Sequence, residues 1–160
     1  MASSVDMDAP TEVRDAAVAD LDPVTLYAIL ALRSAVFVVE QQCVYLDLDG
    51  RDLEPSARQL WVARAGEVMA TLRLLVELDA TVRIGRVATR RDARGSGLAD
   101  RLVGRALELA GPREVVLDAQ TYLFDWYARF GFVRAGADFL DDGIPHVPMR
   151  RAPSGRRGPT

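Results

Sequence analysis

Lysine is absent from the 160-residue sequence, and all 20 basic side chains are arginines. The absence excludes a lysine Schiff base and the phosphate-binding lysine of P-loop nucleotide hydrolases. Any phosphate must therefore be held by backbone amides and guanidinium groups. The formal net charge of −3 is close to neutral, so the charge balance indicates neither a nucleic-acid partner nor a membrane partner.

Cysteine and histidine are each present only once, as Cys43 and His146. A single cysteine excludes an internal disulfide and a thiolate-rich metal site, and we expect no metal cofactor. No stretch approaches about 18 uninterrupted apolar residues. The first ten residues also lack the basic and apolar regions of a secretory signal. We therefore expect a soluble protein in the reducing setting of the cytoplasm.

Length and composition predict one folded domain between two flexible ends. A chain of this size in which 49% of the residues are hydrophobic can bury a substantial core. Residues 1–10 are small and polar, whereas residues 151–160 combine Pro, Gly and Arg without apolar periodicity. We assign both segments as flexible and place the single domain at residues 11–150.

Apolar periodicity and turn signals predict a mixture of strands and helices. Asp22 followed by Pro23 is typical of a helix start, and Gly111 followed by Pro112 of a helix end. The expected order is a first strand, a helix at about 23–38, a hairpin that turns at 65–66, a strand at 81–89, a helix at about 97–110, a strand at 114–119, a short helix at 121–130 and a closing hairpin. This order predicts an α/β or α+β domain around a mixed sheet.

Two charged residues accompany the apolar stripe of the first predicted helix. Arg33 lies within the stripe and Glu40 lies beside it, so each needs a partner or water. We expect Arg33 to be structural. Two interpretations of Glu40 stay open, an ion pair with Arg33 or Arg73 and a role as general base.

The segment after this helix, residues 41–58, is long and irregular, as functional loops often are. Asp47, Asp49 and Asp52 within it either attract a cationic substrate or are solvated turn formers. Cys43 is expected to be buried and unreactive.

The stretch RRDARGSGLADRLV, residues 90–103, is a basic, glycine-containing turn between a predicted strand and a predicted helix. Helix N-termini present unpaired amides, and glycines let a phosphate approach the main chain, so the turn is a candidate anion site. It lacks the Gly-x-Gly-x-x-Gly spacing of dinucleotide folds and the lysine of P-loops. A coenzyme with a pyrophosphate and a different fold is therefore favoured, and the alternative is a solvated turn.

This turn is one of several motifs that resemble a known superfamily. Arg94-Gly95-Ser96-Gly97-Leu98-Ala99 resembles the acetyl-coenzyme A pyrophosphate loop of the GCN5-related N-acetyltransferase (GNAT) superfamily, and Tyr127-Ala128-Arg129-Phe130-Gly131-Phe132 resembles a later motif. The stretches LYAILALRSAVFVVEQQCVYLDLDGRDL, RIGRVAT, DAQTYLFDWYARFGF and DDGIPHVPM are similar to its ElaA-like branch. The resemblance covers about residues 25–149, and four ordered blocks are more specific than one loop.

The resemblance implies a GNAT-like fold, a mixed and V-splayed central sheet flanked by helices. Acetyl-coenzyme A would be the cosubstrate and would lie between the strands at 81–89 and 114–119. Its pantetheine arm would pair with backbone groups of Val87, Ala88 and Thr89. Its pyrophosphate would lie on the amides of the six residues from Arg94 to Ala99.

Direct acetyl transfer needs a neutral amine and a proton for the leaving thiolate. Tyr127 matches the tyrosine that protonates the coenzyme A sulfur in many members, and its phenol is protonated at neutral pH; alternatively, it is a core residue. Gln120 stands where the superfamily often has an asparagine near the coenzyme, so its amide would orient the pantetheine or Tyr127; alternatively, it is a polar residue that faces water at the end of its strand. His146 is either a base or a structural residue. Gln59 replaces a histidine that is common in the branch, so a mechanism that uses this histidine does not carry over.

The expected function is acetyl-coenzyme A-dependent N-acetylation of a primary amine in a small molecule or a peptide. Two alternatives stay open. One is an acetyl-coenzyme A-binding sensor without significant turnover. The other is an acyltransferase similar to acyl-homoserine lactone synthases, which share the fold and a helix similar to RSAVFVVE. The sequence does not identify the acceptor, and it leaves the oligomeric state open, a homodimer included.

Overall fold

The computed structural model describes residues 12–154. Residues 1–10 and 155–160, which we expected to be flexible, lie outside the described residues. Arg151, which we assigned to the flexible tail, is the last residue of strand β8 (Ile144–Arg151). Its Nε donates to the carbonyl oxygen of Phe130 at 3.0 Å, so the folded chain continues past the expected end at residue 150.

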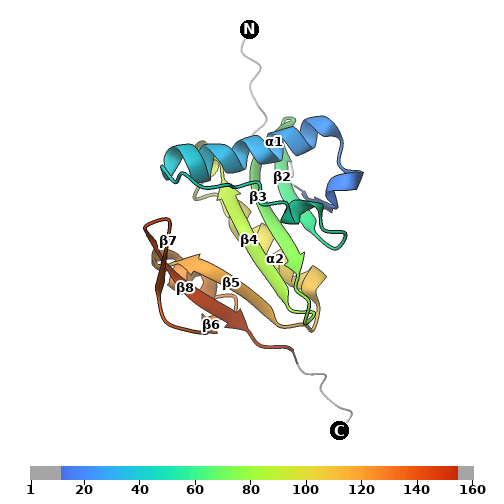
Figure 1. Cartoon of the computed structure of the whole chain (residues 1–160). Coiled ribbons are helices and arrows are strands. Elements are labelled where there is room, and N and C mark those ends of the chain that lie inside the picture. Colours follow the sequence, from blue (N-terminus) through green and yellow to red (C-terminus); the bar gives the residue numbers. More distant parts are fainter. Residues whose placement is uncertain (1–11, 155–160) are drawn as a thin grey trace.

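An eight-stranded mixed sheet forms the centre of the molecule (Figure 1). Its strands are β1 (Val13–Ala16), β2 (Arg58–Arg64), β3 (Glu67–Val76), β4 (Val82–Thr89), β5 (Val115–Gln120), β6 (Val133–Arg134), β7 (Phe139–Asp141) and β8. Their spatial order is β1-β2-β3-β4-β5-β8-β6, with β7 paired to β8. Strands β4 and β5 pair in parallel, and the other pairs between described strands are antiparallel. The mixed sheet confirms the expected fold class.

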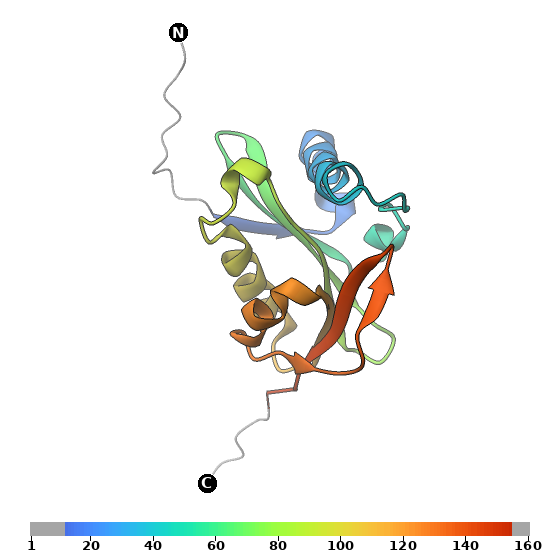
Figure 2. The same ribbon diagram turned by 90° about the vertical axis from the view of Figure 1, so that its left-hand side faces the viewer.

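The parallel contact between β4 and β5 is short. Two residue pairs hold it, Val82 with Val115 and Arg83 with Val116. Beyond these pairs the two strands diverge, so the sheet has two arms (Figures 1 and 2). The arm β1–β4 and the arm β5–β8 are therefore joined at one end and open at the other.

Strand β4 carries a bulge just after the point of divergence. Its register with β3 shifts between Thr71 and Arg73, so the two β4 residues Arg86 and Val87 face a single β3 residue. Arg86 has a φ of 49°, which is uncommon for a residue other than glycine. A bulge bends a strand and changes the direction of the residues beyond it. Here it lies at the start of the last residues of β4, which the family resemblance assigns to pantetheine binding.

Helices cover both faces of the sheet (Figure 2). α1 (Pro23–Arg33) packs on one face, mainly against β3, and η2 (Ser34–Glu40) packs against β4. α2 (Leu98–Ala110) packs on the other face against β2, β3 and β4. α3 (Phe124–Ala128) follows β5. Four short 3-10 turns complete the structure, η1 (Val18–Asp20), η3 (Arg51–Leu53), η4 (Arg91–Ala93) and η5 (Thr121–Leu123). The larger apolar cluster lies on the α2 side and the smaller one on the α1 side.

The first helix begins as predicted and ends later. The side chain of Asp22 accepts a hydrogen bond from the amide of Thr25 at 2.9 Å, and Pro23 opens the helix. Its last seven residues form a π-helix that ends at Glu40. The 18 residues from Pro23 to Glu40 have a mean hydropathy of 1.6, enough by length and composition to cross a membrane. Their apolar side, with Ile29, packs on the sheet.

Arg33 at the end of α1 is the centre of a buried ion-pair network. Its side chain is 0% exposed. Nε donates to Asp47 Oδ2 at 3.0 Å, and Nη1 donates to Asp52 Oδ1 at 2.7 Å. Burial alone would lower the pKa of Arg33, but the two aspartates raise it above its ordinary value. The guanidinium therefore stays charged inside the protein.

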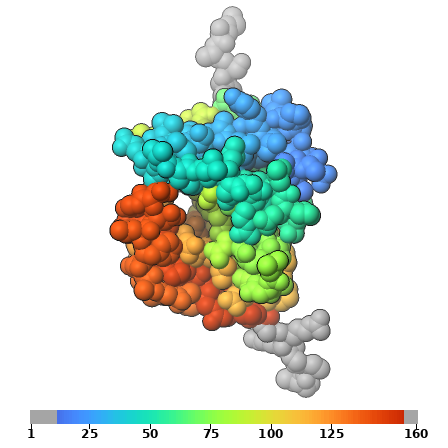
Figure 3. All heavy atoms as spheres, in the orientation of Figure 1, coloured from blue at the N-terminus to red at the C-terminus, as the bar shows by residue number. Residues whose placement is uncertain are grey.

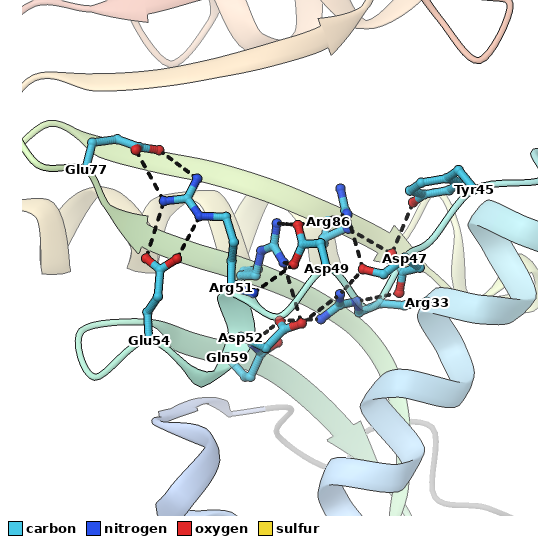
Figure 4. Close-up of polar contacts among 11 residues, drawn as sticks. Arg33, Tyr45, Asp47, Asp49, Arg51, Asp52, Glu54, Gln59, Glu77 and Arg86 are labelled. Atoms are coloured by element: carbon cyan, nitrogen blue, oxygen red, sulfur yellow. Dashed lines mark hydrogen bonds and ion pairs between the residues drawn. The ribbon is translucent and has the colours of Figure 1, made fainter.

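Two arginines of the sheet extend this network (Figure 4). Arg73 on β3 pairs with Asp49 at 2.8 Å, and Arg86 on β4 pairs with Asp47 at 2.8 Å. Gln59 on β2 donates to Asp52 at 2.8 Å. Segment 41–58 is thus tied to both the first helix and the sheet.

The network corrects our expectation for the acidic loop. Asp47 and Asp52 are buried and paired with arginine, so they are neither solvated turn formers nor free to attract a cationic substrate. Asp49 does form a turn, since it accepts a hydrogen bond from the amide of Arg51, but it is also bound to Arg73. The reason for the difference is that three arginines on α1, β3 and β4 face the segment. The structural role that we expected for Arg33 is confirmed.

Replacing Arg33 tests the importance of this network. Arg33→Met removes one partner and leaves two buried carboxylates, so the free energy of unfolding should fall by about 3–5 kcal/mol. Denaturant unfolding followed by circular dichroism measures the loss. Arg129→Met, which breaks the exposed pair with Asp100, is the control and should leave the midpoint nearly unchanged. Equal stability of the two variants would show that the buried aspartates do not depend on Arg33 for their stabilisation.

Candidate functional site

A cleft of about 870 Å³ lies between the two arms of the sheet. Figure 3 shows the hollow between the orange and red segments of the second arm and the green and cyan segments of the first. Its walls come from β4, the turn after β4, the start of α2, the end of β5, α3, the β7–β8 hairpin and the end of η2. The cleft is the space created where β4 and β5 stop pairing.

The structure brings almost all of the predicted site residues to this cleft. Ser96 is the exception, because it is not part of the lining and its hydroxyl donates to the carbonyl oxygen of Ala93 at 2.6 Å. The predicted residues that line the cleft are Glu40, Val87, Ala88, Thr89, Arg94, Gly95, Gly97, Leu98, Ala99, Gln120, Tyr127 and His146. They come from five separate parts of the chain.

The turn between β4 and α2 has the geometry of an anion site. Gly95 and Gly97 have φ values of 78° and 80°, in the region that favours glycine. α2 begins at Leu98, and no side chain caps its first turn, so these amides have no acceptor within the helix. A Cβ atom built at Gly95 or Gly97 would meet no atom within 4 Å. The main chain of the turn is therefore open to a phosphate.

Arg94 connects this turn to the end of η2. Its Nη2 donates to Glu40 Oε2 at 2.7 Å, and its Nε donates to the carbonyl oxygen of Thr89 at 3.1 Å. The ion pair that we expected for Glu40 with Arg33 or Arg73 is wrong, because the loop aspartates take both of those arginines. The hydrogen bond from Arg94 lowers the pKa of Glu40, which weakens it as a general base.

Tyr127 is buried and belongs to the lining of the cleft. The residue is 5% exposed and packs edge-to-face on Trp126 and Phe132, with centroid distances of 4.7 Å and 6.0 Å. Within residues 12–154, no group forms a hydrogen bond with its hydroxyl. Burial raises the pKa of Tyr127 above its ordinary value, so the phenol stays protonated. It is a core residue that also belongs to the lining of the cleft.

His146 has one ring nitrogen bound and the other available. Nδ1 lies 2.7 Å from the carbonyl oxygen of Ile144, which can only accept, so Nδ1 carries the proton in the neutral ring. Nε2 is then an acceptor. The ring stacks on Phe139 at a centroid distance of 5.6 Å and lies opposite Gln120 in the β5–β8 register. A neutral imidazole oriented in this way can accept a proton in the cleft.

Several cleft residues were not found from the sequence. Gln41 accepts a hydrogen bond from Gln120 at 3.2 Å, and Arg86 lies over the ring of Tyr45 at 5.3 Å. No local motif marks these residues, because they meet only when segment 41–58 folds against the sheet. Gln59 is buried under Asp52 and does not line the cleft.

The remaining candidate, Cys43, also lines the cleft. Cys43 is buried, as we expected, and its Sγ lies 3.5 Å from the carbonyl oxygen of Gln41. In the part of the chain that the structure describes, no group of three or more His, Cys, Asp or Glu side chains could hold a metal ion.

Comparison with known proteins identifies related chains. The sequence profile described as Acetyltransferase (GNAT) domain matches residues 34–152. The UPF0039 protein Rv2851c of Mycobacterium tuberculosis is 52% identical over 141 residues, which cover 86% of this chain and 90% of that protein. The protein ElaA of Escherichia coli is 39% identical over 132 residues, which cover 79% of this chain and 86% of that protein.

Solved structures agree with these matches. The crystal structure of an acyl-CoA N-acyltransferase from Pseudomonas aeruginosa has a TM-score of 0.85 and 43% identity, over 89% of this chain and 100% of that one. The crystal structure of Escherichia coli ElaA has a TM-score of 0.84 and 36% identity, over 89% and 99%. An aminoglycoside 6′-N-acetyltransferase complexed with coenzyme A, with a TM-score of 0.70 and 12% identity, and the synthase LasI, with 0.69 and 18%, share the fold alone.

Substitution of Gly97 tests the turn as an anion site. Gly97→Glu introduces a negative charge at the open main chain, so the affinity for coenzyme A should fall by about tenfold or more. Gly97→Ala imposes the same backbone strain without the charge and should retain most of the binding. Calorimetric titration of both variants with coenzyme A measures the two affinities, and thermal melts check that the variants are equally stable. Equal affinity of the two variants would mean that the turn does not bind the pyrophosphate.

Proposed function

Since the chain belongs to the GNAT acetyltransferase family, we propose that it transfers an acetyl group directly from acetyl-coenzyme A to a primary amine of a small molecule or a peptide. One observation carries the proposal. Tyr127, whose hydroxyl has no hydrogen-bond partner among the described residues, and His146, whose Nε2 is an acceptor, line the same cleft as the glycine turn. A proton donor and a proton acceptor thus share one space with an anion site.

The cleft residues fit the coenzyme that this family uses. The pyrophosphate would bind the turn from Arg94 to Ala99, where the main chain is open and the helix start is uncapped. The pantetheine arm would follow Val87 to Thr89, where β4 no longer pairs with β5. The coenzyme supplies the acetyl group as a thioester, which is already activated for attack by an amine.

We assign proton removal from the acceptor amine to His146. An alkyl ammonium ion must lose a proton before its nitrogen can attack, and imidazole is a suitable base at neutral pH. The hydrogen bond from Nδ1–H to the Ile144 carbonyl fixes the tautomer that presents Nε2 as an acceptor. Glu40 is less suited to this role, since its carboxylate is paired with Arg94.

We assign proton delivery to the departing sulfur to Tyr127. Its packing between Trp126 and Phe132 fixes the ring, and its burial keeps the phenol protonated. Without a hydrogen-bond partner among the described residues, the hydroxyl is free to donate to the thiolate. The core aromatic residues therefore position the acid.

The acid role predicts a specific defect in Tyr127→Phe. The ring packing is retained, so the affinity for coenzyme A should change less than about threefold, whereas turnover should fall by about 100-fold. Because burial raises the pKa of Tyr127, deprotonation of this residue should reduce wild-type turnover only above about pH 10. Thiol release against a panel of amines measures turnover. Unchanged turnover at saturating coenzyme would reject the assignment.

The base role predicts a pH-dependent defect in His146→Asn. The asparagine amide can still donate to the Ile144 carbonyl, so the hairpin should be retained while the proton acceptor is lost. Turnover near neutral pH should fall by about 100-fold and recover as the pH rises, because the amine then deprotonates in solution. A wild-type pH profile in this variant would contradict the assignment. Coenzyme binding without thiol release from any amine, in the wild type, would favour the sensor alternative.

A further inference from the structure

The end of η2 contacts both arms of the cleft through two adjacent residues. Glu40 forms the ion pair of 2.7 Å with Arg94, in the turn after β4. Gln41 accepts the hydrogen bond of 3.2 Å from Gln120, the last residue of β5. All four side chains line the cleft. One short segment therefore holds a polar group on each side of the opening between the arms.

A π-helical turn puts these two residues in place. The amide of Gln41 donates to the carbonyl oxygen of Val36 at 3.0 Å, five positions earlier, as in a π-helix. The chain then turns at Gln42, which has a φ of 54°. π-helical turns are rare and frequently lie at functional sites. An α-helical ending would point residues 40 and 41 in other directions.

The partners of this segment are groups that the proposed function needs for the coenzyme. Arg94 is the basic side chain of the pyrophosphate turn, and Gln120 lies on the facing strand. A guanidinium that is paired with a carboxylate has fewer donors left for a phosphate. The carboxylate also brings a negative charge toward the place where the pyrophosphate would bind. Both effects oppose coenzyme binding.

We propose that Glu40 is an internal competitor of the coenzyme, which holds Arg94 by an ion pair that the pyrophosphate must exchange for its own. The inference rests on the proposed function and concerns the regulation of the same site. Glu40 then acts as a residue that sets the affinity for pyrophosphate-containing thioesters.

The opposite role for Glu40 is a positioning one. A carboxylate that only orients Arg94 toward a phosphate would increase coenzyme affinity, so its loss would weaken binding. The two roles therefore predict changes of opposite sign. Arg94 and Glu40 have exposed fractions of 42% and 30%, which makes the pair accessible to exchange. Pairs of this exposure are weak, and an effect of about fivefold is expected.

The experiment compares Glu40→Gln with the wild type and with a matched control. Glu40→Gln keeps the shape of the side chain and removes its charge. Glu108→Gln removes the charge of another exposed glutamate that pairs with an arginine, on α2 and away from the cleft. Calorimetric titration at low ionic strength is made with coenzyme A and with pantetheine, which lacks the pyrophosphate. The same titrations in an Arg94→Gln background complete a double-mutant cycle.

Glu40→Gln should bind coenzyme A about fivefold more tightly than the wild type and pantetheine equally well. Glu108→Gln should resemble the wild type, and the gain from Glu40→Gln should fall below about twofold when Arg94 is replaced. Equal or weaker coenzyme A binding by Glu40→Gln, with normal binding by the wild type, would overturn this inference alone. Absence of coenzyme A binding by the wild type would overturn the proposed function and this inference with it.

Discussion

The buried guanidinium of Arg33 is the constraint on which the arrangement around the cleft depends. A charge with no exposed surface must keep its counter-charges close, because the cost of leaving it unpaired exceeds what the surrounding apolar contacts supply. Asp47 and Asp52 therefore cannot leave it, and they carry segment 41–58 with them. The segment has little helix or strand of its own, so few main-chain hydrogen bonds hold it in place. Side-chain ion pairs to α1, β3 and β4 hold it instead. One wall of the cleft is held in this way.

The opposite wall is held by apolar packing instead. α3 and β8 place Tyr127 and His146 there, the first among aromatic rings and the second against Phe139. These contacts orient the two rings, and neither the phenol hydroxyl nor Nε2 has a hydrogen-bond partner among the described residues. The divergence of β4 from β5 sets the distance between a polar wall and an aromatic wall. Such a division suits a reaction that needs a bound anion on one side and proton transfer on the other.

Much of the fold was predictable from the sequence because its signals are local. The Asp22 cap, the proline after it and the glycines at 95 and 97 act through neighbouring residues, and each has the expected geometry. The motifs around Arg94 and Tyr127 indicated the fold through resemblance. What the sequence did not predict is which charges meet. Glu40 and Arg94 are 54 positions apart, and their contact depends on a π-helical turn and on a bulge in β4 that no short pattern marks.

The case of Glu40 shows why residue type and helical periodicity are insufficient to assign a chemical role. Periodicity placed Glu40 beside the apolar stripe of the first helix, and the residue does line the cleft, but it does so at the end of a π-helical turn that periodicity does not describe. A carboxylate there can accept a proton only if nothing stabilises its charge, and the guanidinium of Arg94 does stabilise it. The same geometry that weakens Glu40 as a base makes it an anion in a cleft that fits an anionic ligand. The partner of Glu40, rather than its position on the helix, therefore decides its role. Glu40 competes with a phosphate because both carry a negative charge.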